Sequence, residues 1–353
     1  MLQRKERPAR WQNRAVGGVV VVSVMLGATV SLALMLGSVH VPVVSVWEVV
    51  GRRLGVPGLD VSLLDDRIVW QLRLPRVLGA AATGAGLALC GAVLQSLTRN
   101  DLADPYLLGI SNGAAVGAVS VIVLGVSFAG LVGTALVGAG AFVGALAALA
   151  LVLTLASGRS GALPPTRVVL AGVAVGQVCA AYTSFVVMMS GDHDAARRVL
   201  GWTLGSLAGI RWNGALVLVG LVVLAFCLVM AYTRALDAFA FGEVAAGSLG
   251  VSVRRTRWTL MVATAVVTAG LVAFTGAIGF VGLVVPHLAR LVCGPLHRTL
   301  LPLSAAGGAL LLVLADTAAR TVVPGQEVPV GVVTAAVGAP VFVWLLHRQG
   351  STA

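Results

Sequence analysis

GAIGFVGLVVPHLAR, residues 276–290, is the stretch that decides the fold class of this chain. Its first fourteen residues carry no formal charge, and glycines and a proline interrupt the apolar positions. A glycine inside a helix costs about 1 kcal/mol and a proline about 3 kcal/mol, so a soluble core helix would rarely contain this run. Membrane helices accept small residues because these let neighbouring backbones approach closely. We therefore expect a short membrane helix that reaches water at His287 and Arg290, although composition alone also fits an ordinary hydrophobic span.

The composition extends this interpretation to the whole chain of 353 residues. Hydrophobic residues make up 58% and charged residues only 10%, whereas soluble domains contain about 25% charged residues. The fold class expected is an all-α, polytopic membrane protein built from apolar runs of about 20 residues. The ten expected spans cover roughly residues 15–36, a run after Arg76 that ends near Leu97, 107–125, 130–156, 168–189, 213–232, 258–275, 276–292, 299–315 and 328–346.

The distribution of basic residues sets the expected orientation. Ten spans that begin in the cytoplasm place 15 of the 24 basic residues in inner segments, as the positive-inside rule requires. The predicted organisation is a cytoplasmic tail over residues 1–14, one transmembrane domain over 15–346 and a second tail over 347–353. Residues 73–91 and 255–276 share a basic start and a run of small residues, which indicates a possible inverted repeat.

Several classes of function are disfavoured by the residues that the sequence lacks. Lys5 is the only lysine, so the chain has no P-loop lysine to hold nucleotide phosphates. The arginines lie between apolar spans rather than in one patch, so no nucleic acid is expected. The four cysteines form no CxxC pair and are interpreted as packing residues. No metal site, cofactor or enzymatic activity is predicted, and His287 is interpreted as structural.

Several motifs resemble those of the FecCD-type permeases, which belong to ABC importers of iron-siderophore complexes, haem and cobalamin. The stretch 276–290 itself is similar to the family signature, and the resemblance runs from Trp70 onward. Further matches are Arg73-Leu-Pro-Arg76, the segment 95–105, Phe241-Gly242-Glu243 with Ala245 and Gly250, residues 327–331 and residues 338–342. Asp101 replaces a proline that the family usually has, and Asp237 stands where asparagine is common.

The resemblance assigns roles to three groups of residues. Arg73, Arg76 and Arg320 are expected at the outer face, where they would receive acidic residues of a substrate-binding protein; arginines that reach for lipid headgroups are the alternative. Thr166 would lie at a cytoplasmic gate.

The cytoplasmic loop 233–257, and within it residues 237–250, would form short helices that dock on an ATPase subunit; a solvated amphipathic loop is the alternative. The coupling residues expected are Phe239, Phe241, Gly242, Glu243, Ala245 and Gly250. Asp316 and Arg320 are spaced to form an i,i+4 pair.

The function expected is that of a permease subunit in the plasma membrane of a bacterium. Its partners would be a second permease subunit, two copies of an ABC ATPase, an extracytoplasmic binding protein and membrane lipid. A siderophore is the first expectation for the cargo, with haem or cobalamin next, and the sequence leaves open whether the dimer is homomeric or heteromeric. An ion-driven secondary transporter is the main alternative, but such proteins need ionisable residues near the bilayer centre, and the expected spans contain essentially none. A membrane scaffold or receptor without transport is a further alternative.

Overall fold

All regular structure in the described parts of the chain is helical. The computed structural model describes residues 6–37, 39–125, 133–157, 163–191 and 193–350. The helices are α1 (Glu6–Met35), α2 (Val43–Arg53), α3 (Leu63–Asp66), the π-helical turn η1 (Arg67–Arg73), α4 (Leu74–Thr98), the 3₁₀ turn η2 (Pro105–Leu108), α5 (Ile110–Leu124), α6 (Gly133–Ser157), α7 (Pro165–Met189), α8 (His193–Thr203), α9 (Trp212–Ala231), α10 (Thr233–Phe239), α11 (Glu243–Ser248), α12 (Val253–Thr275), α13 (Val281–Cys293), α14 (His297–Thr321) and α15 (Val330–Gly350). Parts of the two expected tails, residues 1–5 and 351–353, lie outside this description.

Seven of the helices in the described residues are long and apolar enough to cross a membrane. They lie at Gly17–Met35, Leu63–Thr98, Gly133–Ser157, Pro165–Met189, Trp212–Ala231, Val253–Thr275 and His297–Thr321. Three shorter apolar helices occupy Ile110–Leu124, Val281–Cys293 and Val330–Leu345. The helical fold class is confirmed, and these helices coincide with the ten expected runs, but the number of crossings stays a prediction.

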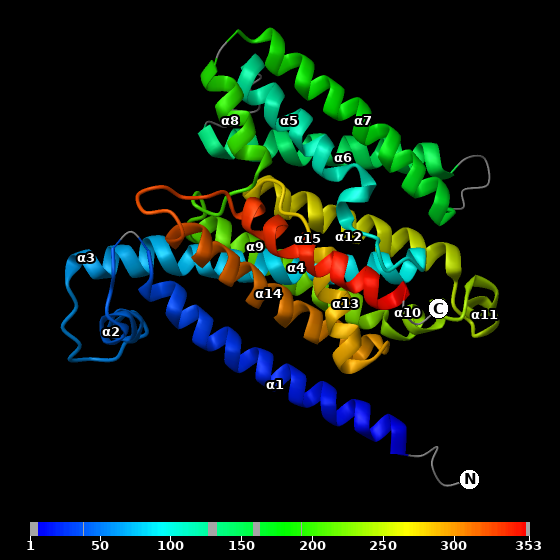
Figure 1. Ribbon diagram of the computed structural model, residues 1–353, viewed down its shortest axis with the longest axis horizontal. Coiled ribbons are helices and arrows are strands. Elements are labelled where there is room, and N and C mark those ends of the chain that lie inside the picture. The colour runs from blue at the N-terminus through cyan, green and yellow to red at the C-terminus, as the bar shows by residue number, and fades with distance from the viewer. Residues whose placement is uncertain (1–5, 38, 126–132, 158–162, 192, 351–353) are drawn as a thin grey trace.

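The two ends of the molecule differ in which elements they carry (Figure 1). α1 begins and α15 ends at the end that carries α10 and α11, which we call the inner end. α2 and α3 lie at the opposite, outer end. α4 and α12 run in opposite directions in this view, as an inverted repeat would require, although the repeat itself remains a prediction. This arrangement agrees with an orientation in which both termini are cytoplasmic.

Two expected loop boundaries are wrong. The expected spans leave residues 37–72 outside the membrane helices, but these residues contain α2 and a helix that starts at Leu63 and continues into α4. Ser62 caps that start by accepting a hydrogen bond from the backbone N–H of Asp65, 3.0 Å away. The loop expected from Asp316 likewise begins later, because α14 continues to Thr321. The charges of Asp316 and Arg320 suggested solvent, whereas both side chains are buried and paired with each other.

The expected membrane helix over residues 276–290 is wrong in its first five residues. α12 ends at Thr275, and α13 begins only at Val281. Gly276 has a φ of 68°, and a Cβ placed there would lie 2.2 Å from the Trp202 carbonyl oxygen, so only glycine fits. Phe280 also has a positive φ, of 68°, a strained conformation for a side chain of this size. The segment 276–280 is therefore an irregular break between two helices at membrane depth, where neighbouring protein must satisfy its polar backbone groups.

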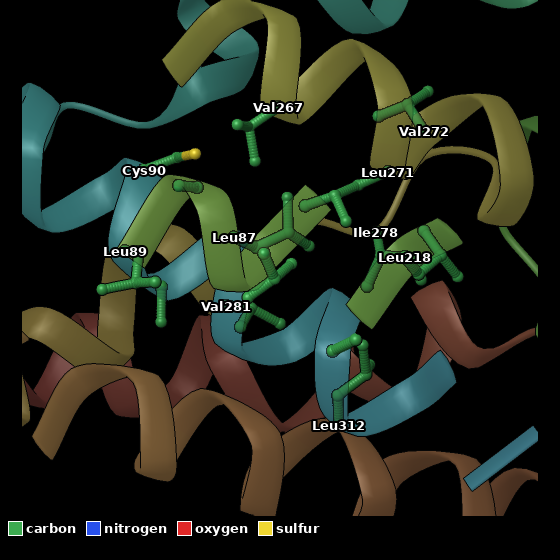
Figure 2. Close-up of a cluster of buried hydrophobic side chains, with 14 of the residues drawn as sticks. Leu87, Leu89, Cys90, Leu218, Val267, Leu271, Val272, Ile278, Val281 and Leu312 are labelled. Atoms are coloured by element: carbon green, nitrogen blue, oxygen red, sulfur yellow. The ribbon is translucent and has the colours of Figure 1, made fainter. Parts of the chain in front are cut away.

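α4 lies at the centre of the packing. Figure 2 shows Leu87 of α4 among side chains from other helices, including Leu271 of α12 and Val281 of α13. Small residues allow the backbones to meet there. A Cβ placed on Gly84 would lie 2.1 Å from the Gly308 carbonyl oxygen of α14, and one on Gly91 would lie 1.9 Å from the Gly282 carbonyl oxygen of α13. Close backbone approach of this kind is how helices associate in membranes, where hydrophobic burial provides little driving force.

This packing predicts a strong contrast between two glycine replacements. Gly84→Ala forces α4 and α14 apart, and overpacking of this kind costs about 1–3 kcal/mol. Gly220→Ala, on α9, meets no atom within 4 Å and should stabilise its helix by about 1 kcal/mol. Thermal unfolding of the purified protein in detergent would measure both. Equal midpoints for the two variants would contradict the close contact between α4 and α14.

Candidate functional sites

A cavity of about 650 Å³ opens at the outer end and is rich in arginine. It lies between η1, α4, the loop before α9 and the loop after α14. Its lining includes the three arginines expected at the outer face, Arg73, Arg76 and Arg320, and also Arg211 and Glu327. The structure thus brings together three residues that are up to 247 positions apart in the sequence.

Arg76 is the most heavily paired of these arginines. Its Nε and Nη2 atoms donate to Asp316 Oδ1 at 3.0 and 2.9 Å, and its Nη1 atom donates to Glu327 Oε1 at 3.0 Å. The two carboxylates differ in environment, since the Asp316 side chain is 1% exposed and the Glu327 side chain 52%. A guanidinium fork suits two carboxylates at once. A carboxylate arriving from outside would have to displace Glu327 or share Arg76 with it.

Arg73 and Arg320 bind the carboxyl end of α1. The Nη1 atom of Arg73 donates to the carbonyls of Leu34 at 2.6 Å and Met35 at 2.9 Å, and its Nη2 atom donates to that of Val39. Arg320 donates to the carbonyls of Ala33 and Leu36, both at 3.2 Å. The last carbonyls of a helix lack partners within that helix, and positive charge there is favourable. Both arginines therefore have a structural task, and their docking role stays a prediction.

Arg211 was not among the expected docking residues. It is exposed at the start of α9, and its Nη1 atom donates only to carbonyls of its own turn, those of Ala208 and Ile210. Its one signal in the sequence is its position directly before Trp212, at the outer end of an apolar run. That signal is weak because many arginines flank membrane spans.

At the inner end, residues 233–250 form the two short helices that were expected, α10 and α11. The glycines that bound α11 have the backbone conformation for which glycine is needed, with φ of 96° at Gly242 and 84° at Gly250. Phe241 is 77% exposed, and Val244 and Leu249 beside it are also exposed. This apolar surface, formed by Phe241, Val244 and Leu249, is suited to a protein partner.

Phe239 was expected to reach a pocket on the ATPase, and that part of the prediction is wrong. Its side chain is 1% exposed and packs inside its own chain. The guanidinium carbon of Arg257 lies 5.6 Å from the ring centroid, a cation–π contact. Arg257 also donates to Glu243 Oε1 at 2.7 Å. The ion pair of Glu243 with Arg257 thus connects α11 to the start of α12, and the buried Phe239 side chain packs α10 against the same arginine.

The structure gives positions for the remaining expected residues, and their functional roles stay predictions. Thr166 is exposed in the first turn of α7, directly after two prolines. Ala245 is half-buried in α11. All four cysteines are free thiols. No group of three or more histidine, cysteine, aspartate or glutamate side chains that could hold a metal occurs in the part of the chain that the structure describes.

Tyr106 is a residue that the sequence did not reveal. Its hydroxyl donates to the Ile278 carbonyl oxygen at 2.7 Å and accepts from the Ile278 N–H at 2.5 Å. It therefore satisfies both polar backbone groups at the middle of the 276–280 break. Asp104 holds the start of η2, since its Oδ1 atom accepts from the Tyr106 N–H at 2.9 Å. Burial raises the pKa of Asp104 to about 6, although this hydrogen bond opposes the rise.

The profile of the FecCD transport family matches residues 24–348, which is nearly the whole chain. The chain belongs to the FecCD transport family. The family membership expected from the motifs is therefore confirmed.

Individual relatives point in the same direction. The cobalamin import system permease protein BtuC of Halobacterium salinarum is 40% identical, over 97% of this chain and 90% of that protein. The vitamin B12 import system permease protein BtuC of Vibrio cholerae is 39% identical, over 99% of this chain and 97% of that protein. The ABC transporter permease protein YvrB of Bacillus subtilis, whose printed name assigns it no substrate, is 36% identical over 96% of both chains.

Solved structures support the fold. A metal-chelate type ABC transporter in an inward-facing conformation superposes with a TM-score of 0.80 and 28% identity, over 94% of this chain and 98% of that chain. PsaBC from Streptococcus pneumoniae in complex with Fab superposes with a TM-score of 0.52 at 17% identity, over 76% of this chain and 88% of that chain, and shows a likeness of fold alone.

Proposed function

We propose that this protein is the membrane-spanning permease subunit of a binding-protein-dependent ABC importer that carries a metal chelate into the cell. The observation that carries the proposal is the family match over residues 24–348. The geometry of the protein suits the role of an importer subunit, because paired arginines line a cavity at the outer end and an apolar surface lies exposed at the inner end. A multi-pass position in the plasma membrane follows from the family and from the apolar helices.

The energy would come from a partner. Lys5 is the only lysine in the sequence, so a standard P-loop is absent and the protein is not itself an ATPase. The exposed apolar surface of α11 would meet an ABC ATPase, two copies of which would serve a permease dimer. At the outer end, an extracytoplasmic binding protein would deliver the cargo. Support for these partners comes from the ABC permease relatives and from the positions of the two surfaces.

The cargo favoured now is a corrinoid. The sequence motifs placed a siderophore first, because that is the broadest class in the family. Two of the relatives at about 40% identity carry names that specify cobalamin or vitamin B12, and the structural neighbour is named for metal chelates. A bulky chelate carries its own metal ligands, so the pathway needs space and weak contacts rather than coordinating side chains.

Uptake into proteoliposomes tests both the function and the cargo. The permease would be reconstituted with its cognate ATPase and binding protein, and labelled cobalamin, ferric siderophore and haem would be offered separately. We expect ATP-dependent accumulation of cobalamin above the other two. Accumulation driven by an ion gradient without ATP would favour a secondary transporter, and no accumulation of any chelate would contradict the proposal.

A further inference from the structure

Three polar side chains from three different elements meet at the inner end. Asp237 lies in α10, His297 is the first residue of α14, and Ser96 lies in the last turn of α4. Asp237 Oδ1 accepts from the backbone N–H of His297 at 2.9 Å and lies 2.6 Å from its Nδ1 atom. The Nε2 atom of the same ring lies 2.5 Å from Ser96 Oγ. One imidazole ring therefore joins α10 to two long helices, α4 and α14.

The ring is enclosed, so these contacts are its whole polar environment. His297 is 4% exposed, and leaving a buried polar atom without a partner is costly. Burial alone would raise the pKa of Asp237, but the hydrogen bonds from the His297 ring and backbone N–H lower it further, so the pKa lies below its ordinary value. Asp237 is therefore an ionised acceptor at neutral pH.

Serine, histidine and aspartate in series also form the nucleophilic triad of hydrolases. Here Ser96 lies within a helix, and its hydroxyl is also 2.9 Å from the Ala92 carbonyl oxygen. Ser96, His297 and Asp237 therefore all bond to groups within the protein, and we interpret them as a structural connection rather than as a hydrolase triad.

The two helices joined by His297 are also tied together along their length. At mid-helix, Gly84 of α4 and Gly308 of α14 bring the two backbones into contact. At the outer end, Arg76 of α4 is paired with Asp316 of α14 at 2.9 Å. α4 and α14 thus form a pair, here called the α4–α14 pair, that is fastened at both ends and reaches from the arginine-lined cavity to α10.

α10 and α11 have a second attachment that does not involve this pair. Glu243 is bound to Arg257 of α12, and Phe239 packs under the same arginine. Loss of the His297 contacts should therefore leave α10 and α11 attached to the body through α12. The hydrogen-bonded link that the imidazole makes between Asp237 of α10 and Ser96 of α4 would then be lost.

We propose that His297 is a positioning residue that connects the ATPase-contacting segment to the α4–α14 pair. Through this connection, binding-protein arrival at the outer cavity and ATP hydrolysis at the inner end influence one another. The inference rests on the proposed function, because it takes α10 and α11 as the segment that meets the ATPase. The connection consists of a charge-assisted contact between Asp237 and the His297 imidazole and of the contact between the same ring and Ser96.

The test uses the complete importer in proteoliposomes and compares His297→Ala, Asp237→Ala and Asp237→Asn. We expect both alanine variants to lower binding-protein-stimulated ATP hydrolysis about tenfold, since each leaves buried polar groups unpaired. The ATPase subunit concentration that gives half-maximal activity should stay unchanged, because the surface formed by Phe241, Val244 and Leu249 is intact. Asp237→Asn retains an acceptor for the His297 N–H and should recover most of the stimulation.

Controls separate this inference from folding defects and from the proposed function. Thr299→Ala removes a hydroxyl that donates to the Leu296 carbonyl oxygen and does not contact Asp237, His297 or Ser96, and it should behave as wild type. Thermal midpoints identify any variant that fails to fold, and Ser96→Ala then serves as a milder second probe of the same ring. Wild-type stimulation in folded His297→Ala and Ser96→Ala would overturn the inference. Absence of stimulation in the wild-type importer would instead overturn the proposed function.

Discussion

Replacing Asp316 with alanine should destabilise the protein more than any other single charge removal at the outer end. The carboxylate is 1% exposed and lies 2.9 Å from Arg76 and 3.2 Å from Arg320. Removing one partner of a buried charge pair costs about 3–5 kcal/mol, because the other charge stays buried without compensation. Two arginines lose their shared partner here, and one of them also holds the end of α1. Thermal or denaturant unfolding in detergent would measure the loss.

Glu327→Gln is the matched control for Asp316→Ala. Glu327 contacts the same guanidinium as Asp316 does, at 3.0 Å, but its side chain is 52% exposed. Exposed ion pairs contribute about 0–1 kcal/mol, so little stability should be lost. If the two variants unfolded at the same temperature, the arginine cluster would not depend on Asp316 for its stability.

The same contacts change how docking at the outer end should be tested. From sequence alone, Arg76 and Arg320 were expected to receive acidic residues of the binding protein, so replacing both with glutamate would be the direct test. In the structure this double variant should lose stability, because Arg320 holds the carboxyl end of α1 and both arginines neutralise Asp316. Arg211→Glu is the better probe, since Arg211 is exposed at the rim of the same cavity and bonds only to carbonyls of its own turn.

The sequence was most informative where local pattern and structure coincide. Long apolar runs predicted the helices, and the spacing of Asp316 and Arg320 predicted their i,i+4 contact, which is present at 3.2 Å. The glycines at 242 and 250 predicted turns between short helices, and both have positive φ. These features depend on residues close to one another in the chain, which is why composition and spacing were sufficient.

Features that depend on distant residues were missed. The break at residues 276–280 is apolar and reads as a helix, but Tyr106, 172 positions away, provides hydrogen bonds for Ile278. Phe239 and Phe241 are two positions apart in one amphipathic loop, and only the tertiary packing, in which Phe239 joins the core beneath Arg257, determines which ring is buried. Arg73 was likewise expected as an outer docking arginine, whereas its guanidinium donates to carbonyls at the end of α1. Tertiary contacts, rather than local pattern, settle all three.

Phe241→Asp is expected to uncouple ATP hydrolysis from transport while the permease stays folded. The ring is 77% exposed on the inner surface, so the isolated protein loses little when it is replaced. An aromatic side chain at the centre of an interface commonly contributes about 2 kcal/mol or more, which corresponds to roughly a thirtyfold loss of affinity. The ATPase subunit should therefore be recovered poorly in pull-downs, and binding-protein-stimulated ATP hydrolysis should fall.

Two further variants determine whether the effect of Phe241→Asp arises at the interface. Phe241→Leu keeps an apolar side chain and should retain most of the pull-down. Phe239→Asp places a charge in a site that is 1% exposed beneath Arg257, so it should lower the thermal midpoint of the isolated permease, which Phe241→Asp should not. Binding of the loaded binding protein at the outer end should survive Phe241→Asp. Wild-type pull-down and stimulation in that variant would exclude α11 as the contact for the ATPase, and the energy would then have to enter through a different inner segment.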